Sequence, residues 1–408
     1  MKNEAQLLED TRSSFLWTRV LNVPFFAILK LLPLILYKEL QISPLQIAVY
    51  VAIQPISGIL ASYWSSAIHK RQDLLAANIV WANILRFMPF LFFPWIDSPW
   101  LMILASAIYM TLNRGMMPAW MEIFKRNIKG ITREKIFAFG SSVDYLGPAL
   151  LLVVMGWYLD DFHTHWRWLF FGTGLLGLFS TFFLSRLPDL PLTNQEVPTV
   201  KEWLIKPWKE SFDLLKERPD FQKFQIGFML GGAGLIVIAA VLPMFFVDVL
   251  NLSYREMAIA IALCKGVAFA ATSPLWVRLF HKTDIFSFCS FVTLLAALFP
   301  FLLYTAQFQI GLLYIAYLFY GIMQAGSELG WHMSGPVFAK EEESSHYSQL
   351  NILSVGVRGC VAPFCVSILY LISSPTVVLF LGALLCLASS QRLFAFSKQV
   401  LVQARQKV

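Results

Sequence analysis

Charge is scarce in this chain, and the signatures of the common enzyme classes are missing. Only 14% of the 408 residues are charged, against roughly a quarter in soluble proteins. The sequence contains no HExxH, no G-x-S-x-G, no phosphate-binding loop and no carboxylate pair at a catalytic spacing. These absences argue against hydrolases and ATP-driven pumps, and they predict that the protein is not an enzyme.

Cysteines are few and form no disulfide framework. All five fall inside apolar stretches: Cys264, Cys289, Cys360, Cys365 and Cys386. The first fourteen residues lack the basic region and short apolar core of a secretory signal, so no cleaved signal peptide is expected. His163 and His165 lack the spacing of a metal site, so neither a metal nor a cofactor is predicted.

Long hydrophobic runs dominate the sequence instead. The chain is 57% apolar, and a membrane-spanning helix needs about 20 mostly apolar residues. We place twelve such spans, six in each half of the chain. They are 15–37, 45–68, 74–95, 99–121, 136–159, 167–187, 224–247, 256–279, 285–305, 310–334, 348–371 and 375–394. Because barrel strands would be about half as long, the predicted fold class is an all-α integral membrane protein with two six-helix bundles.

An internal repeat supports two similar halves. Trp64, His69 and Lys70 recur as Trp276, His281 and Lys282 at an offset of 212 residues. A second set follows at an offset one residue shorter, with Tyr109, Gly115 and Trp120 matching Tyr320, Gly326 and Trp331. A fixed offset of this kind predicts that the chain builds the same helical unit twice.

Basic residues predict the orientation. With the amino terminus inside, three Lys and Arg residues fall in outer loops and five in span interiors, which leaves 24 of the 32 on the cytoplasmic side. Both termini are therefore expected in the cytoplasm. The same asymmetry explains the net charge of +7, so nucleic acid is not an expected partner.

The two bundles are predicted at 1–187 and 224–408, joined by a cytoplasmic linker at 188–223. Within the linker, Trp208, Phe212 and Leu215 follow a helical spacing, with Lys209 and Lys216 elsewhere on the turn. This pattern favours a short helix lying on the inner leaflet. A solvated linker is the alternative, because Pro207 interrupts the segment.

Twelve spans in two halves with a long central loop resemble the major facilitator superfamily. Several short motifs carry the likeness: Gly58 and His69-Lys70-Arg71 between spans two and three, Arg114-Gly115 and Pro118-Ala119 in span four, and Gly140, Gly147 and Pro148 in span five. The acidic residue of the first motif is absent, and Leu151 and Leu152 stand where antiporters carry glycines.

The resemblance implies a secondary transporter that works by alternating access. Its solute cleft would lie between the two halves, lined by spans 1, 4, 7 and 10 and flanked by 2, 5, 8 and 11. Members of this family are usually monomeric. The lipid bilayer and a small-molecule solute are the implied partners.

Ionisable residues within the spans point to the solute. At mid-membrane such a residue costs about 2.5–3.5 kcal/mol on insertion scales, so it is a functional candidate by default. Seven qualify: Lys30, Arg86, Arg114, Asp144, Lys265, Glu328 and Arg358. Five are cationic, and an aqueous cleft with excess positive charge attracts anions.

We therefore predict a small anionic solute, an organic acid or a phosphorylated metabolite. Eight residues form the predicted binding set: Lys30, Arg114, Lys265, Arg358, Gln54, Asn113, Gln324 and Trp331. Arg86, on the third span, is predicted to be structural and to bond backbone carbonyls or a neighbouring helix.

The alternative is that the charges pair internally and hold helices together. Asp144 would then neutralise Arg114, and Glu328 would neutralise Lys265 or Arg358, with three cations left over. The two carboxyl groups are also the candidates for proton coupling, since their affinity for a proton depends on burial and on a nearby cation.

A charge pair across the cytoplasmic loops is predicted as an inner gate. The loop between spans four and five carries Lys125, Arg126 and Lys129, and its counterpart carries Glu341, Glu342 and Glu343. Ion pairs between them would hold the cleft closed on the inside. The alternative is two solvated surface runs, since exposed pairs contribute at most about 1 kcal/mol.

Three functions remain open from the sequence. The first is a secondary transporter for a small anion, coupled to protons as a symporter, in a bacterial inner membrane. The second is an exporter of amphipathic drugs or lipids, which the 36 phenylalanines and 13 tryptophans favour. The third is a membrane enzyme or receptor, which the missing catalytic motifs disfavour.

Overall fold

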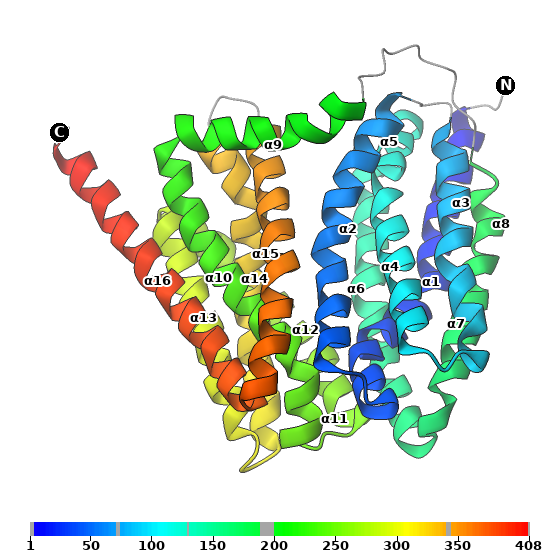
Figure 1. The fold of residues 1–408 in the computed structure, drawn as a ribbon. Coiled ribbons are helices and arrows are strands. Elements are labelled where there is room, and N and C mark those ends of the chain that lie inside the picture. Colours follow the sequence, from blue (N-terminus) through cyan, green and yellow to red (C-terminus); the bar gives the residue numbers. More distant parts are fainter. Residues whose placement is uncertain (1–3, 71–73, 129, 188–199, 340–343, 407–408) are drawn as a thin grey trace. The chain divides into compact units, whose positions relative to one another are not determined.

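A computed structural model describes residues 4–70, 74–128, 130–187, 200–339 and 344–406, and all regular structure in these ranges is helical (Figure 1). The chain forms two compact units. Unit 1 comprises Met1–Ile42, Ile56–Thr199 and Ser253–Ala258, and unit 2 comprises Ser43–Pro55, Val200–Leu252 and Ile259–Val408.

Unit 1 is a bundle of long helices with short 3₁₀ segments at their ends. Its elements are α1 (Glu4–Leu40), α2 (Pro44–Lys70) from Ile56 onward, α3 (Leu75–Phe87), η2 (Met88–Trp95), α4 (Pro99–Gly115), α5 (Met117–Asn127), α6 (Gly130–Asp161), η3 (His163–His165), α7 (Trp166–Phe179), α8 (Thr181–Leu184) and α11 (Tyr254–Ala258).

Unit 2 holds the remaining helices. They are α9 (Val200–Glu217), α10 (Pro219–Met244), the π-helical turns η4 (Phe245–Val249) and η5 (Ile259–Cys264), α12 (Lys265–Lys282), α13 (Ile285–Thr305), α14 (Gly311–Ala339), α15 (Ser344–Ile372) and α16 (Pro375–Gln406). Within this unit α9 lies across the ends of α10 and α15 (Figure 1). The helix predicted in the linker is thus present, and Trp208 and Phe212 on it are exposed.

Helix length and hydropathy agree with a membrane protein. Among the described residues, nine helical stretches are long and apolar enough to cross a bilayer. The other three predicted spans are helical as well. Residues 99–121 fall on α4 and α5, 136–159 lie within α6, and all but the first residue of 310–334 lie within α14.

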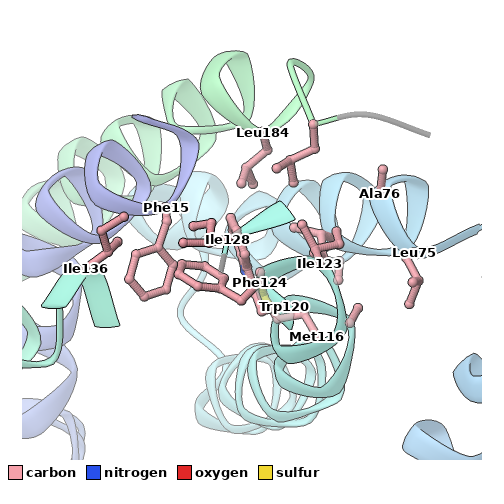
Figure 2. Packing of buried hydrophobic residues seen from close by; sticks show 14 residues of the cluster. Phe15, Leu75, Ala76, Met116, Trp120, Ile123, Phe124, Ile128, Ile136 and Leu184 are labelled. Carbon is pink, nitrogen blue, oxygen red and sulfur yellow. The ribbon is translucent and has the colours of Figure 1, made fainter. Parts of the chain in front are cut away.

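An aromatic and aliphatic cluster joins one end of α1 to α3, α5 and α6 in unit 1 (Figure 2). Phe15 of α1 is 3% exposed, and its ring centroid lies 4.3 Å from that of Phe124 and 5.4 Å from that of Trp120. Burial of one side chain of this size contributes about 1.5–3 kcal/mol to the stability of the folded protein. The cluster therefore fixes the position of α1 one turn away from Arg19.

The internal repeat reappears as the same packing contact in each unit. A Cβ placed on Gly115 would lie 2.9 Å from the ring of Trp64, and a Cβ on Gly326 would lie 2.9 Å from the ring of Trp276. In both units, glycine lets a helix backbone lie directly against a tryptophan face. The repeat predicted from the sequence is confirmed at these four positions.

The short helix α11 belongs to unit 1 although it lies in the second half of the sequence. Asp160, near the end of α6, accepts hydrogen bonds from the backbone N–H groups of Tyr254 (2.8 Å) and Arg255 (3.0 Å). The Tyr254 hydroxyl donates to Glu39 of α1 over 2.6 Å. These bonds satisfy the free amide groups at the start of α11 and attach it to α1 and α6.

Asp284 caps α13 and is expected to make stability depend on pH. It accepts from the N–H groups of Phe286 and Ser287 and from the Ser397 hydroxyl at 2.9–3.0 Å. Partial burial raises the pKa of this carboxyl, but the hydrogen bonds from Ser287, Ser397 and Phe286 outweigh it, so the pKa lies below its usual value. The stabilisation is therefore complete above the unfolded pKa of about 3.9 and lost as the pH falls through the lower folded value.

Asp284→Ala should destabilise the protein by about 1 kcal/mol at pH 7, the usual loss for a helix cap. Thermal unfolding of purified protein at pH 3 to 7 checks this. The difference in melting temperature between wild type and Asp284→Ala should become smaller as the pH falls. Asp284→Asn should melt nearly like wild type. A gap that stays constant with pH would contradict the assignment.

Candidate functional site

An ion pair joins α1 to α6 inside unit 1. The Arg19 guanidinium donates to Asp144 Oδ2, and the two side chains are 13% and 33% exposed. Glycine allows the approach, because a Cβ on Gly140 would lie 2.5 Å from the Phe15 ring and 2.9 Å from Arg19 Cδ. Two turns further along α6, a Cβ on Gly147 would lie 2.7 Å from Val23 Cγ1.

Arg86 of α3 lies buried beside this pair. It is 2% exposed and donates to the side-chain oxygens of Asn83 (2.6 Å) and Asn113, while its guanidinium lies 4.6 Å from the Phe87 ring centroid. Both acceptors are neutral amides. Arg86 thus bonds the neighbouring helix α4, in line with the structural role expected for it, but its charge has no hydrogen-bonded carboxylate partner among the described residues.

These groups line a cavity of about 110 Å³, which we call the unit 1 cavity. Its lining residues are Phe15, Thr18, Arg19, Asn22, Phe26, Arg86, Asn113, Met116, Met117, Trp120 and Asp144. Four enclosed atoms have no hydrogen-bond partner among the described residues: Thr18 Oγ1, Asn22 Oδ1, Arg86 Nε and Asp144 Oδ1. Since enclosed polar atoms are nearly always satisfied, the cavity is suited to water or to a polar ligand.

The other cations predicted in the first half are not among the residues that line this cavity. Lys30 and Arg114 are exposed, and no hydrogen bond or ion pair joins either to another described residue. The Arg114 Nη1 atom lies 3.2 Å from where a Cβ on Gly58 would be. Asn113 of the predicted binding set accepts a hydrogen bond from Arg86 through its side-chain oxygen. Gln54 is exposed and belongs to the segment grouped with unit 2.

In unit 2, Arg358 of α15 lies against α10. It donates to the Phe228 carbonyl over 2.7 Å, and its guanidinium lies 4.4 Å from the Phe228 ring centroid. Trp331 stacks on the same ring at 5.3 Å and 28°. Gly232 makes room for the guanidinium, since a Cβ there would lie only 1.9 Å from it. Arg358 and Trp331, both predicted from the sequence, are thus brought together by a residue that was not.

A chain of amides and hydroxyls lies nearby in unit 2. Gln225 donates to Asn351, and Asn351 donates to Ser334 over 2.8 Å. On α14, Gln324 donates to Glu328 over 3.2 Å, and the Lys265 ammonium lies 4.9 Å from the Tyr320 ring centroid. Tyr320, Gln324 and Glu328 follow one face of α14 at four-residue spacing.

The structure gives Asp144 and Arg358 other hydrogen-bond partners than those suggested from the sequence. Asp144 is bonded by Arg19 and not by Arg114, because Gly140 lets α1 pack directly against α6. Glu328 is bonded by Gln324, and Arg358 by a backbone carbonyl. Of the predicted gate, Lys129, Glu341, Glu342 and Glu343 and the Lys125 side chain lie outside the described residues, while Arg126 pairs with Glu122 of its own helix at 2.7 Å.

Sequence reasoning missed Arg19, Thr18 and Asn22. Arg19 falls only four residues into the predicted first span, where a basic residue is ordinary for the cytoplasmic end of a span. The signal was present, because Thr18 and Asn22 lie at i and i+4 and place polar atoms on the helix face that also carries Phe15. No group of three or more His, Cys, Asp or Glu side chains that suits a metal ion occurs among the described residues.

The family follows from comparison with known proteins. The family model described as Major Facilitator Superfamily matches residues 23–363. The chain belongs to this superfamily. It is accordingly a secondary transporter, an integral multi-pass membrane protein and not an enzyme, and the predicted all-α fold class is confirmed. No curated protein matches the chain.

Several solved structures share the fold at low identity. The nucleoside transporter NupG gives a TM-score of 0.70 at 14% identity, covering 97% of this chain and 99% of that one. The peptide transporter POT in complex with alafosfalin gives 0.75 at 12%, covering 98% and 99%. A POT family transporter in complex with 5-aminolevulinic acid gives 0.66 at 14%, covering 96% of each chain. At these identities the likeness establishes the fold alone.

Proposed function

We propose that this transporter moves a small anionic solute, an organic acid or a phosphorylated metabolite, by alternating access. The observation that carries the proposal is the lone arginine of the predicted binding set in unit 2, Arg358, and Arg86 of unit 1 has partners of the same kind. Arg86 in unit 1 and Arg358 in unit 2 are hydrogen-bonded only to neutral oxygens among the described residues. An enclosed cation without a carboxylate partner is costly, and a bound anion would remove that cost.

The binding set remains as predicted. It comprises Lys30, Arg114, Lys265, Arg358, Gln54, Asn113, Gln324 and Trp331. Arg358 supports the proposal best, because its flat fork of donors suits a carboxylate or phosphate and the Phe228–Trp331 stack beside it suits a planar or apolar portion of the solute.

We further propose that transport is coupled to protons, as in a symporter. Asp144 and Glu328 are the carboxyl groups available for this role within the spans. Asp144 is the stronger candidate because its Oδ1 atom is enclosed and has no donor among the described residues. A proton there would meet an unsatisfied acceptor.

The remaining proposals concern topology. The two bundles at 1–187 and 224–408, with the linker at 188–223, would sit in a bacterial inner membrane as a monomer with both termini in the cytoplasm. The inner gate would pair Lys125, Arg126 and Lys129 with Glu341, Glu342 and Glu343. The lysine and arginine distribution along the sequence supports this orientation.

A thermal-shift screen tests the solute class. Purified protein is heated with metabolites grouped by charge, including small acids and peptides, because a bound ligand raises apparent stability by mass action. We expect one anionic class to stabilise the native protein, and Lys265→Ala and Arg358→Ala to lose at least about tenfold in affinity, as for a lost charged hydrogen bond.

The matched control is Arg392→Ala, which removes an exposed arginine of α16. It should respond like the native protein. Stabilisation by amphipathic or cationic compounds alone, undiminished in Arg358→Ala, would instead support an exporter of drugs or lipids.

A further inference from the structure

The charged groups of the unit 1 cavity do not balance. Two guanidinium groups, Arg19 and Arg86, and one carboxylate, Asp144, line it, so the cluster carries one surplus positive charge. Arg19 is bonded to Asp144, whereas Arg86 is bonded only to amide oxygens among the described residues. Arg86, which carries the charge without a carboxylate partner, is 2% exposed, so water screens it poorly.

We propose that the unit 1 cavity binds one monovalent anionic group between Arg19 and Arg86, and that a proton on Asp144 strengthens this binding. The site is additional to the residues predicted from the sequence, because neither arginine belongs to that set. Its link to proton coupling rests on the proposed function, whereas the anion site itself does not.

The enclosed donors suit an anion. Arg86 Nε and Thr18 Oγ1 can both donate, and both atoms are buried and have no partner among the described residues; Arg86 is 2% and Thr18 5% exposed. The cavity volume of about 110 Å³ is several times what one water molecule requires. It therefore has room for a chloride ion, or for a carboxylate or phosphate group.

Asp144 controls the charge of the site. The charged and titratable groups that face it are Arg19 from α1, Arg86 from α3 and Tyr109 from α4. Ionised Asp144, which lines the cavity, leaves a net charge of +1, and its negative charge and its unsatisfied acceptor Oδ1 both disfavour a bound anion. A proton on Oδ1 raises the net charge to +2 and turns this acceptor into a third donor.

Proton and anion therefore bind cooperatively. A proton alone places a second uncompensated charge in the cavity, and an anion alone lies next to an ionised carboxylate. Bound together, they restore the original net charge of +1. Thermodynamic linkage then requires each to raise the affinity for the other by the same factor. One monovalent anion per proton makes the joint step electroneutral.

A charge series on the Arg19–Asp144 pair tests the proposal. The probes are chloride, acetate and inorganic phosphate, each titrated against gluconate at constant ionic strength, with affinity read from calorimetry and melting temperature. Asp144→Asn should bind the preferred probe at least about tenfold more tightly than wild type at pH 7.5, and Arg19→Gln at least about tenfold more weakly. The double variant restores the charge of +1 and should return to within about threefold of wild type.

The pH dependence gives a second readout. Wild-type affinity should rise as the pH falls, whereas Asp144→Asn should be nearly independent of pH. Arg167→Gln and Asp97→Asn remove an ion pair of the same unit whose Asp97 side chain is 89% exposed, and they should leave the affinity unchanged.

The outcomes separate this site from the proposed function. Equal affinity in all three variants, or weaker binding in Asp144→Asn, would overturn it even if the solute screen succeeds. If the variants show the expected order of anion affinities but the screen finds no solute, the cavity is an inorganic anion site. If the variants show the expected order of anion affinities and the solute from the screen competes with the probe anion, the occupant is the solute's own anionic group.

Discussion

Replacing Gly232 with alanine is expected to reduce Arg358-dependent solute binding at least about tenfold while the protein stays folded. A Cβ at this position would lie 1.9 Å from the Arg358 Cζ and Nη1 atoms, so the guanidinium must leave its place on Phe228. Losing a charged hydrogen bond to the Phe228 carbonyl, together with the contact to its ring, accounts for an effect of this size.

The melting temperature of Gly232→Ala should not fall, although its affinity for the solute does. Alanine is favoured over glycine in a helix by about 1 kcal/mol, and the displaced group is the far end of a flexible side chain. Melting temperature and solute affinity, measured on the same preparation, check the separation. Gly172→Ala is the matched control, because a Cβ there meets nothing within 4 Å. Unchanged affinity in Gly232→Ala would show that the position of Arg358 does not matter for binding.

Replacing Gly140 with leucine is expected to have the larger effect on stability. The side chain would enter the space held by Phe15 and Arg19, with a Cβ 2.5 Å from the Phe15 ring. Overpacking of a filled interface typically costs about 1–3 kcal/mol. To relieve this overlap, α1 and α6 must move apart, and the movement takes Asp144 away from Arg19.

Two measurements on Gly140→Leu distinguish packing from charge. The melting temperature should fall, whereas Gly172→Leu should melt like wild type. Anion affinity in the unit 1 cavity should become independent of pH, because Asp144 no longer faces Arg19. A lower melting temperature with the wild-type pH dependence intact would mean that the ion pair survives the change.

Both predictions depend on glycines that set how closely two helices approach. The sequence offered Gly140 and Gly147 as remnants of an antiporter motif. In the structure they are the contacts of α6 with Phe15 and Val23 of α1. Their role here is to bring a charged residue of one helix to its partner on another.

The fold class could be predicted because its determinants are local. A run of apolar residues long enough to cross a bilayer, and the recurrence of Trp64 and Gly115 as Trp276 and Gly326, are properties of consecutive residues. The helix α9 was predicted for the same reason, since the spacing of Trp208 and Phe212 is visible within a few turns.

The candidate site was predicted only in part. Arg358 and Trp331 were identified by type, because a charge or tryptophan inside an apolar span stands out. The residue that joins them, Phe228, is one of 36 phenylalanines and carries no distinguishing signal. Arg19 was overlooked because its distance from the end of the span resembled that of a cytoplasmic anchor.

The sequence by itself determined the helices, their repeat and the surplus of positive charge among them. The tertiary structure alone decided which charges meet. Asp144 and Arg19 are 125 residues apart along the chain, and no pattern of neighbours along one helix specifies a partner on another. That choice depends on where glycine lets α1 and α6 touch, so the pairing of charges is a property of packing.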